Sequence, residues 1–137
     1  MSKLFKLLAF SLILSSCGSI EEPIKHNYHE IKDRLLNWNQ IFEPSEDYYQ
    51  IYFYSERCGH CNDIKQDILN YYFKSITTMY FVCTDYEVIL GPKSDLTGID
   101  NVDEFYIFGT PFLVEFKDHK VDNYYVGKEQ IISFISI

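Results

Sequence analysis

Hydrophobic and polar residues follow two different periods along this chain, and the period predicts the type of each element. From residue 28 to residue 42 the apolar side chains recur every three or four positions, which is typical of one face of a helix. Those side chains are Tyr28, Ile31, Leu35, Trp38 and Phe42. A polar segment over 43–47, which contains Pro44, then ends the helix. Residues 48–54 are mostly aromatic, which predicts a largely buried strand.

The same two periods, with turn residues between them, predict the second half of the chain. The predicted elements are a helix from 58 to about 73, a strand over 77–84, an irregular segment over 86–101, a short helix over 101–107, strands over 112–116 and 121–126, and a helix from 128 to about 135. A βαβ half is thus followed by a ββα half. This order predicts an α/β fold with one mixed central sheet and helices on both faces.

Length and composition fit one such domain. The chain has 137 residues, of which 47% are hydrophobic, so it has room for a packed core and not for two domains. Its formal net charge is −8, and no basic stripe with interleaved aromatic residues is present in the sequence. Because such a chain repels phosphate groups, nucleic-acid binding is not expected.

The first sixteen residues have the parts of an export signal. Lys3 and Lys6 precede an apolar run over 7–14, which is shorter than the roughly 20 residues that a membrane-spanning helix needs. The run ends in Leu-Ser-Ser-Cys at residues 14–17. This sequence resembles the lipobox of bacterial lipoproteins, in which the cysteine receives a lipid and becomes the mature N-terminus.

That resemblance implies a division of the chain into three parts. Residues 1–16 are a signal peptide that is removed, residues 17–27 are the lipidated Cys17 with a polar tether, and residues 28–137 are the folded domain. The protein is then held by lipid at the extracytoplasmic face of a bacterial cell membrane. The alternative is an ordinary secretory signal in which the cysteine occurs by chance.

A close cysteine pair stands where a predicted strand and a short turn lead into a predicted helix. The residues are Cys58-Gly59-His60-Cys61. Free N–H groups and the partial positive charge of a helix start favour a thiolate on Cys58, and a thiolate is the attacking species in disulfide exchange. Cys61, one turn further on, is expected to lie deeper and to attack the resulting mixed disulfide.

These residues resemble the thioredoxin superfamily, and the tetrapeptide Cys-Gly-His-Cys is typical of protein disulfide isomerase domains. The strand and turn over 52–57, the stretch over 105–112 and the segment over 125–127 before a last helix are also similar to that family. The resemblance spans roughly residues 28–137. It implies a thioredoxin-like fold, a cis Thr110–Pro111 bond against the disulfide, and backbone groups of Thr110 that bind a substrate strand.

The resemblance also assigns roles within the tetrapeptide. Cys58 is the nucleophile and Cys61 the resolving thiol. From their position and charge, His60 is expected to modulate the Cys58 thiolate, with Gly59 beside it, the alternative being a solvated loop residue; Arg57 is either a second modulating group or a surface charge. Two positions depart from the family pattern: Arg57 stands where Trp is usual, and Tyr52 stands where a buried Asp or Glu commonly takes the resolving thiol's proton. No cofactor and no metal are expected.

Other interpretations of the cysteines remain open. The pair can be a structural disulfide or half of a zinc site, but zinc takes four ligands and the sequence has no second such pair. His119 is only an unspecific further ligand. Cys83, within a predicted strand, is interpreted as a buried structural thiol.

The sequence therefore predicts a membrane-anchored thiol–disulfide oxidoreductase that acts on the cysteines of exported proteins. The oxidase or isomerase direction is favoured over reduction, and a membrane redox partner is expected. The alternative is a non-catalytic accessory lipoprotein of the same fold, which docks a transporter or binds client proteins. The 86–101 segment is longer than the fold needs and is interpreted as a partner-binding insertion.

Overall fold

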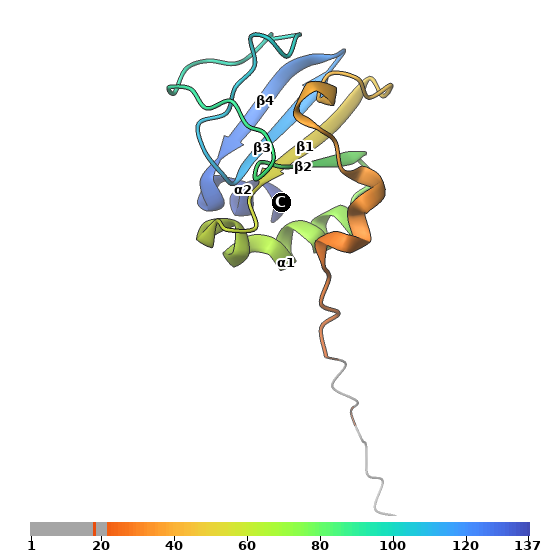
Figure 1. The fold of residues 1–137 in the computed structure, drawn as a ribbon. Helices are drawn as coiled ribbons and strands as arrows, with labels where there is room; N and C mark the ends of the chain where they lie inside the picture. Colours follow the sequence, from red (N-terminus) through yellow and green to blue (C-terminus); the bar gives the residue numbers. More distant parts are fainter. Residues whose placement is uncertain (1–17, 19–21) are drawn as a thin grey trace, which may run out of the picture.

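The computed structural model, which describes residue 18 and residues 22–137, contains four strands and two α-helices in that part of the chain (Figure 1). The elements are the 3-10 helices η1 (Tyr28–Arg34) and η2 (Trp38–Gln40), then β1 (Tyr48–Tyr54), α1 (Gly59–Lys74), β2 (Met79–Cys83), β3 (Phe112–Lys117), β4 (Lys120–Val126) and α2 (Gly127–Ile135). The predicted signal peptide over 1–16 and the predicted lipidation site Cys17 lie outside the described residues. Within the described residues, no helix is both long and apolar enough to cross a membrane.

The sheet has the strand order β2-β1-β3-β4. β1 pairs in parallel with β2 and antiparallel with β3, and β3 pairs antiparallel with β4. The hairpin between β3 and β4 turns at Asp118 and His119, which have φ angles of 51° and 59°. Such left-handed residues match the twist of a hairpin. The predicted α/β fold with one mixed sheet, a βαβ half followed by a ββα half, is confirmed.

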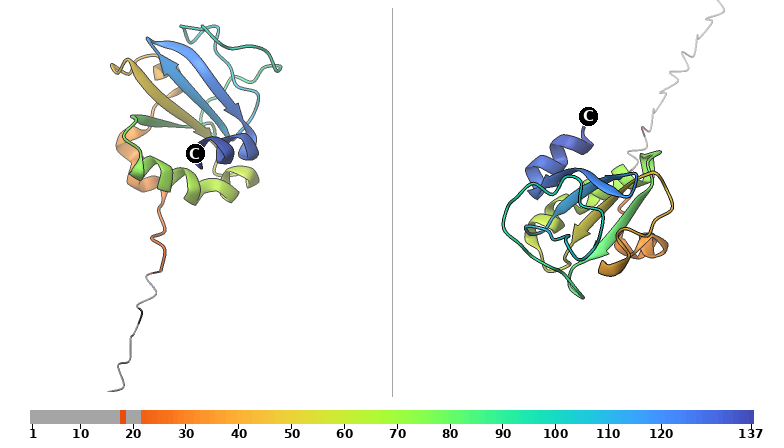
Figure 2. Two further views of the ribbon diagram at one scale, coloured as in Figure 1. Left: turned by 180° about the vertical axis from the view of Figure 1, so that it is seen from behind. Right: turned by 90° about the horizontal axis from the view of Figure 1, so that it is seen from above.

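Alternating side chains of the strands supply two hydrophobic clusters, one on each face of the sheet. On the first face Tyr52, Phe81 and Leu113 pack against α1 and α2, which lie side by side there (Figure 2). On the second face Phe53 and Val114 pack against η2 and the long segment between β2 and β3. Both α-helices therefore cover one face. The helices predicted on both faces are present only in part, because the second face is covered by the 3-10 helix η2 and by irregular chain.

The single helix predicted over 28–42 is wrong. Two 3-10 helices occupy that region, and the backbone between them is extended at Leu35, with φ −77° and ψ 130°. Leu35 forms a parallel bridge to Phe81 of the edge strand β2, and the N–H of Leu36 donates to the Phe81 carbonyl at 2.8 Å. Since an edge strand has free backbone groups, pairing with it competes with helix formation.

The predicted short helix over 101–107 is also wrong. In its place the chain forms turns, in which the Asn101 side chain accepts the N–H of Glu104 at 3.1 Å. The segment from β2 to β3 buries Leu96, Phe105 and Ile107 completely against the sheet. Part of this segment is thus core of the domain, and partner binding over 86–101 stays a prediction.

Candidate active site

The cysteine pair marks the first turn of α1. Cys58 is the N-cap residue, with extended backbone, and its sulfur accepts the N–H of Cys61 at 3.1 Å. The two cysteines form a disulfide, with their Cα atoms 5.2 Å apart. A cysteine at this position lies among the unpaired N–H groups of the helix start, which stabilise a negative sulfur.

The two sulfurs differ in accessibility. Cys61 is fully buried in the cluster formed by α1, α2 and the sheet, whereas Cys58 at the helix start is only partly buried. The predicted difference in depth is therefore present. Cys58 can be reached from solvent, whereas Cys61 cannot be reached without displacing the core. The assigned order of attack stays a prediction.

The loop before β3 lies against the disulfide. The Thr110–Pro111 peptide bond is cis, as predicted, and the Thr110 carbonyl oxygen is 3.5 Å from the Cys58 sulfur. The Pro111 carbonyl accepts the N–H of Gly127 at 3.0 Å, and Gly127 has a φ of 80°. The site thus joins the start of α1, the start of β3 and the start of α2.

Charged side chains on α1 and α2 form a small network beside the pair. The Lys128 ammonium group lies 2.9 Å from a carboxylate oxygen of Asp63, and His60 Nδ1 lies 3.7 Å from the same oxygen. The hydrogen bond from Lys128, followed by its charge, lowers the pKa of Asp63. The predicted positive side chain of His60 therefore has an acidic neighbour, which the sequence analysis did not identify.

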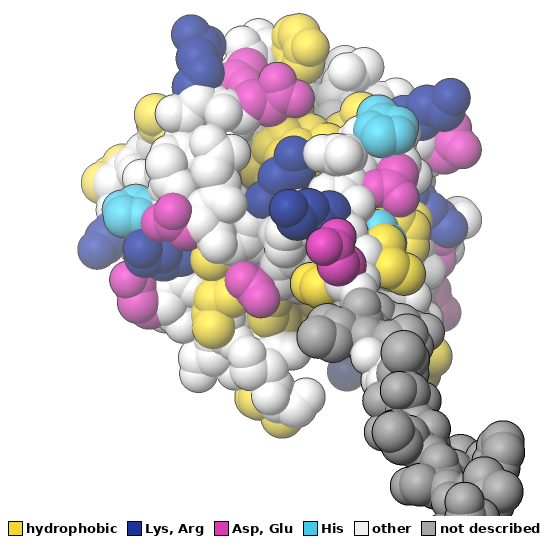
Figure 3. Space-filling model, turned by 90° about the horizontal axis from the view of Figure 1, so that it is seen from below, with side chains coloured by type: hydrophobic (Ala, Val, Ile, Leu, Met, Phe, Trp, Pro, Cys, Tyr) yellow, Lys and Arg dark blue, Asp and Glu magenta, His cyan; other side chains and the backbone are white. Residues whose placement is uncertain are grey.

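The face of the molecule seen from below carries both signs of charge. Lys and Arg side chains lie among Asp and Glu side chains there, with hydrophobic patches between them (Figure 3). The His60 and Asp63 side chains form an exposed pair, with relative exposures of 69% and 56%. Exposed pairs of this sort contribute little to stability.

Arg57 also has a partner that the sequence analysis missed. Its Nε lies 3.5 Å from a carboxylate oxygen of Asp85, which follows the end of β2. The Arg57 side chain is 83% exposed. Its charge is thus shared with Asp85 rather than directed at Cys58 alone. At Gly59 an added Cβ would meet nothing within 4 Å, so the fold imposes no requirement for glycine there.

Tyr52, at the position where an acid was considered, is fully buried under α1. Among the residues that the structure describes, neither its hydroxyl nor that of Tyr28 forms a hydrogen bond of normal geometry, although each hydroxyl acts on the pKa of the other. Burial raises the pKa of Tyr52 far above its ordinary value. A phenol in that state stays protonated at neutral pH, so Tyr52 cannot accept the proton of Cys61.

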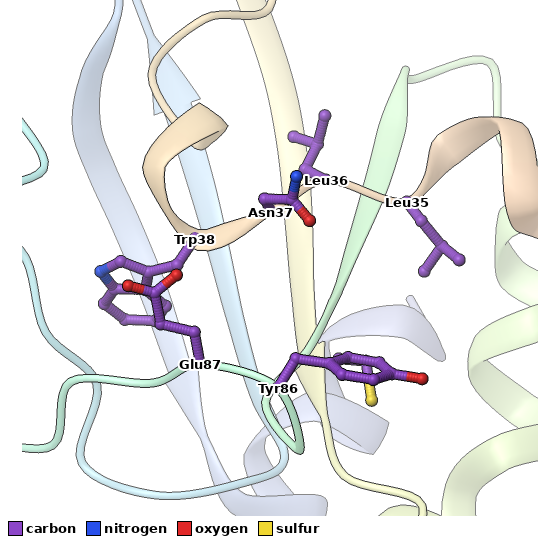
Figure 4. A pocket seen from close by; sticks show the side chains of 7 residues that line it. Leu35, Leu36, Asn37, Trp38, Tyr86 and Glu87 are labelled. Carbon is purple, nitrogen blue, oxygen red and sulfur yellow. The ribbon is translucent and has the colours of Figure 1, made fainter.

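Cys83 lies on the other side of β1 from the hairpin and lines a separate cavity. This cavity has a volume of about 220 Å³, and its lining includes Leu35, Trp38 and Tyr86 (Figure 4). Burial raises the pKa of the Cys83 thiol, which keeps it protonated. Cys83, which was predicted to be a buried structural thiol, is partly buried.

The alternative of a zinc site at the cysteine pair needs further ligands nearby. Within the described part of the chain, no three His, Cys, Asp or Glu side chains are grouped to hold a metal ion. His119, the unspecific zinc candidate, instead lies at the β3–β4 turn, with its ring 6.4 Å from that of Tyr49.

Comparison with known proteins gives structural neighbours only. No protein-family model and no curated protein matches the chain. Thioredoxin f2 of Chlamydomonas reinhardtii is 10% identical, with 74% of this chain and 92% of that chain covered and a TM-score of 0.48. Mitochondrial thioredoxin 3 from Saccharomyces cerevisiae, in its oxidised form, is 17% identical, with 80% and 95% covered and a TM-score of 0.47. A mutant thioredoxin from Halobacterium salinarum is 16% identical, with 76% and 87% covered and a TM-score of 0.47.

Proposed function

We propose that this protein is a thiol–disulfide oxidoreductase that works through the Cys58–Cys61 couple. One observation carries the proposal: a disulfide joins a solvent-accessible N-cap cysteine to a fully buried cysteine one helical turn away. The cis Thr110–Pro111 loop, whose carbonyl lies 3.5 Å from the Cys58 sulfur, adds a backbone edge beside it. A structural disulfide needs neither the helix start nor the exposed sulfur.

In the reductive direction the Cys58 thiolate attacks one sulfur of a substrate disulfide. An S–S bond forms between Cys58 and the substrate, and the other substrate sulfur leaves as a thiolate. Cys61 then loses its proton and attacks the Cys58 sulfur, which releases the second substrate sulfur and forms the Cys58–Cys61 disulfide. The substrate gains two electrons and the couple loses two. The reverse sequence oxidises a substrate dithiol.

The preferred direction of the proposal is oxidation or isomerisation. The helix start stabilises the thiolate, which exists only in the reduced couple, and so favours the disulfide as an oxidant. Lys128 adds positive charge near the first turn of α1, and His60 adds more when it is protonated, although Asp63 offsets part of this charge. A membrane redox partner would restore the couple after each cycle.

The proposed location is the extracytoplasmic face of a bacterial membrane, with exported proteins as substrates. It rests on the lipobox-like sequence that ends at Cys17. The backbone of His26 is already fixed to α1, since its N–H and carbonyl both bond the Gln66 side chain, at 2.9 Å and 2.8 Å. Fully extended, the chain from Cys17 to His26 reaches about 30 Å, so a lipid on Cys17 keeps the domain close to the membrane.

Two standard assays test the proposal on full-length protein carrying Cys17→Ser. The wild-type couple should recover activity from scrambled ribonuclease and should accelerate insulin reduction by dithiothreitol. Cys58→Ser is the matched control, because it removes only the attacking sulfur. If wild-type protein and Cys58→Ser perform equally in both assays, the accessory-lipoprotein alternative replaces catalysis.

A further inference from the structure

A single carboxylate outside the cysteine pair holds the turn that leads into α1. Asp85 follows the end of β2, the parallel neighbour of β1, so it lies beside the point where β1 ends. One of its oxygens accepts the Ser55 hydroxyl at 2.5 Å, and the other accepts the backbone N–H of Glu56 at 2.9 Å. These bonds connect positions about 30 residues apart in the chain.

The contacts extend from Asp85 to Cys58 through Ser55. The Ser55 hydroxyl accepts the N–H of Arg57 at 3.2 Å, and the Ser55 carbonyl accepts the N–H of Cys58 at 3.2 Å. Arg57 also pairs with Asp85 through its side chain. Every residue from 55 to 57 is therefore bonded to Asp85 directly, and Cys58 is bonded to it through one residue.

The carboxylate is suited to this task. The hydrogen bond from Ser55, followed by that from the Glu56 N–H, lowers the pKa of Asp85, so the group is ionised throughout the physiological range. Its side chain is 20% exposed, which limits competition from water. The Cys83 thiol also donates to the Asp85 carboxylate, at 3.5 Å. The described partners of this carboxylate are therefore all hydrogen-bond donors.

We propose that Asp85 is a positioning residue for the proposed disulfide exchange, which fixes the 55–57 turn so that the Cys58 sulfur meets substrate beside Thr110. The inference rests on the proposed function. Thr110 belongs to another loop, and its carbonyl faces the Cys58 sulfur rather than Asp85. Loss of the carboxylate should therefore alter the attack by Cys58 more than substrate binding.

The kinetic test compares variants that change the turn in steps. Asp85→Ala removes the acceptor. Ser55→Ala removes the hydroxyl that joins Asp85 to the Arg57 N–H and keeps the carbonyl that accepts the Cys58 N–H, and Ser55→Thr keeps a hydroxyl. We expect Asp85→Ala and Ser55→Ala to lower kcat for disulfide exchange roughly tenfold, the effect of about one lost charge-assisted hydrogen bond, with KM changed less than about twofold. Ser55→Thr should retain most of kcat. Asp95→Asn, which alters an aspartate that accepts the Thr97 N–H at 3.0 Å, is the control and should match wild type.

A second readout does not depend on catalysis. Hydrogen exchange at the Glu56 amide should become roughly tenfold faster in Asp85→Ala, because that N–H loses its acceptor. Unchanged Glu56 exchange, unchanged kcat, or a kcat loss that only matches the unfolded fraction would each overturn the proposal. If Asp85→Ala does not fold, the Ser55→Ala and Ser55→Thr pair decides it. Wild-type protein without exchange activity would refute the proposed function alone, and the Glu56 measurement would still test the hold on the turn.

Discussion

Two buried tyrosines on β1 are expected to respond differently to replacement by Phe, as measured by the free energy of unfolding. Tyr49 and Tyr52 are both fully buried, and they lie on opposite faces of the sheet. The Tyr49 hydroxyl donates to the Ile41 carbonyl at 2.9 Å, whereas the Tyr52 hydroxyl forms no hydrogen bond of normal geometry among the described residues. Replacing each by Phe removes one oxygen atom and leaves the ring in place.

The expected magnitudes follow from the hydrogen bonds. Tyr49→Phe loses a buried bond and leaves a carbonyl unpaired, so the free energy of unfolding should fall by about 1–2 kcal/mol. Tyr52→Phe removes a hydroxyl that already bears the cost of burial without a bond. Its free energy of unfolding should be unchanged or should rise by up to about 1 kcal/mol.

Urea denaturation of the oxidised proteins measures both values, and a common slope against urea would show that the variants unfold alike. The same two proteins enter the disulfide-exchange assay. Tyr52→Phe should keep wild-type turnover, because a phenol whose pKa is raised by burial does not take the proton of Cys61. A loss of stability in Tyr52→Phe equal to that in Tyr49→Phe, or a tenfold loss of turnover, would refute this reasoning.

Three further predictions concern charge, packing and anchoring. The wild-type couple should have a reduction potential between about −230 and −150 mV in glutathione buffers. Asp63→Asn should raise this potential at low salt, because a negative charge near the thiolate is lost. About 1 M salt should abolish the shift. Gly91→Ala places a Cβ against the Tyr106 ring, closer than atoms can pack, so thermal unfolding should show that the free energy of unfolding falls by about 1–3 kcal/mol. Gly59→Ala is the control and should show no such fall, because an added Cβ there meets nothing within 4 Å. Intact-mass analysis of a membrane fraction should find the N-terminus at Cys17 with added lipid, and an unlipidated N-terminus elsewhere would contradict the anchor.

Strong periodic patterns were enough to predict the elements that build the site. β1, α1 and the β3–β4 hairpin lie within a few residues of their predicted bounds, because their burial follows the local alternation of side chains. The cysteine pair and the Thr110–Pro111 loop were found for the same reason, since their chemistry is visible in short sequence segments.

Two of the failures share a physical cause, which is pairing between distant parts of the chain. The apolar spacing over 28–42 fits one helix, yet the backbone at Leu35 bonds to β2, some 46 residues later. Asp85 meets Arg57 from a distance of 28 residues. Neither contact can be predicted from the local pattern of apolar and polar residues. The position of Asp85, just after a predicted strand that pairs with β1, was nevertheless a usable signal.

The central claim, a reactive Cys58 served by a buried Cys61, has one direct test. Cys61→Ser and Cys58→Ser, each with Cys17→Ser, are incubated with a reduced and an oxidised protein substrate, and mixed disulfides are counted by non-reducing electrophoresis and mass spectrometry. The account predicts that Cys61→Ser accumulates adducts through Cys58, because the resolving sulfur is gone, and that Cys58→Ser accumulates none, because Cys61 is fully buried. Equal trapping by both variants, or adducts on Cys83 alone, would contradict it.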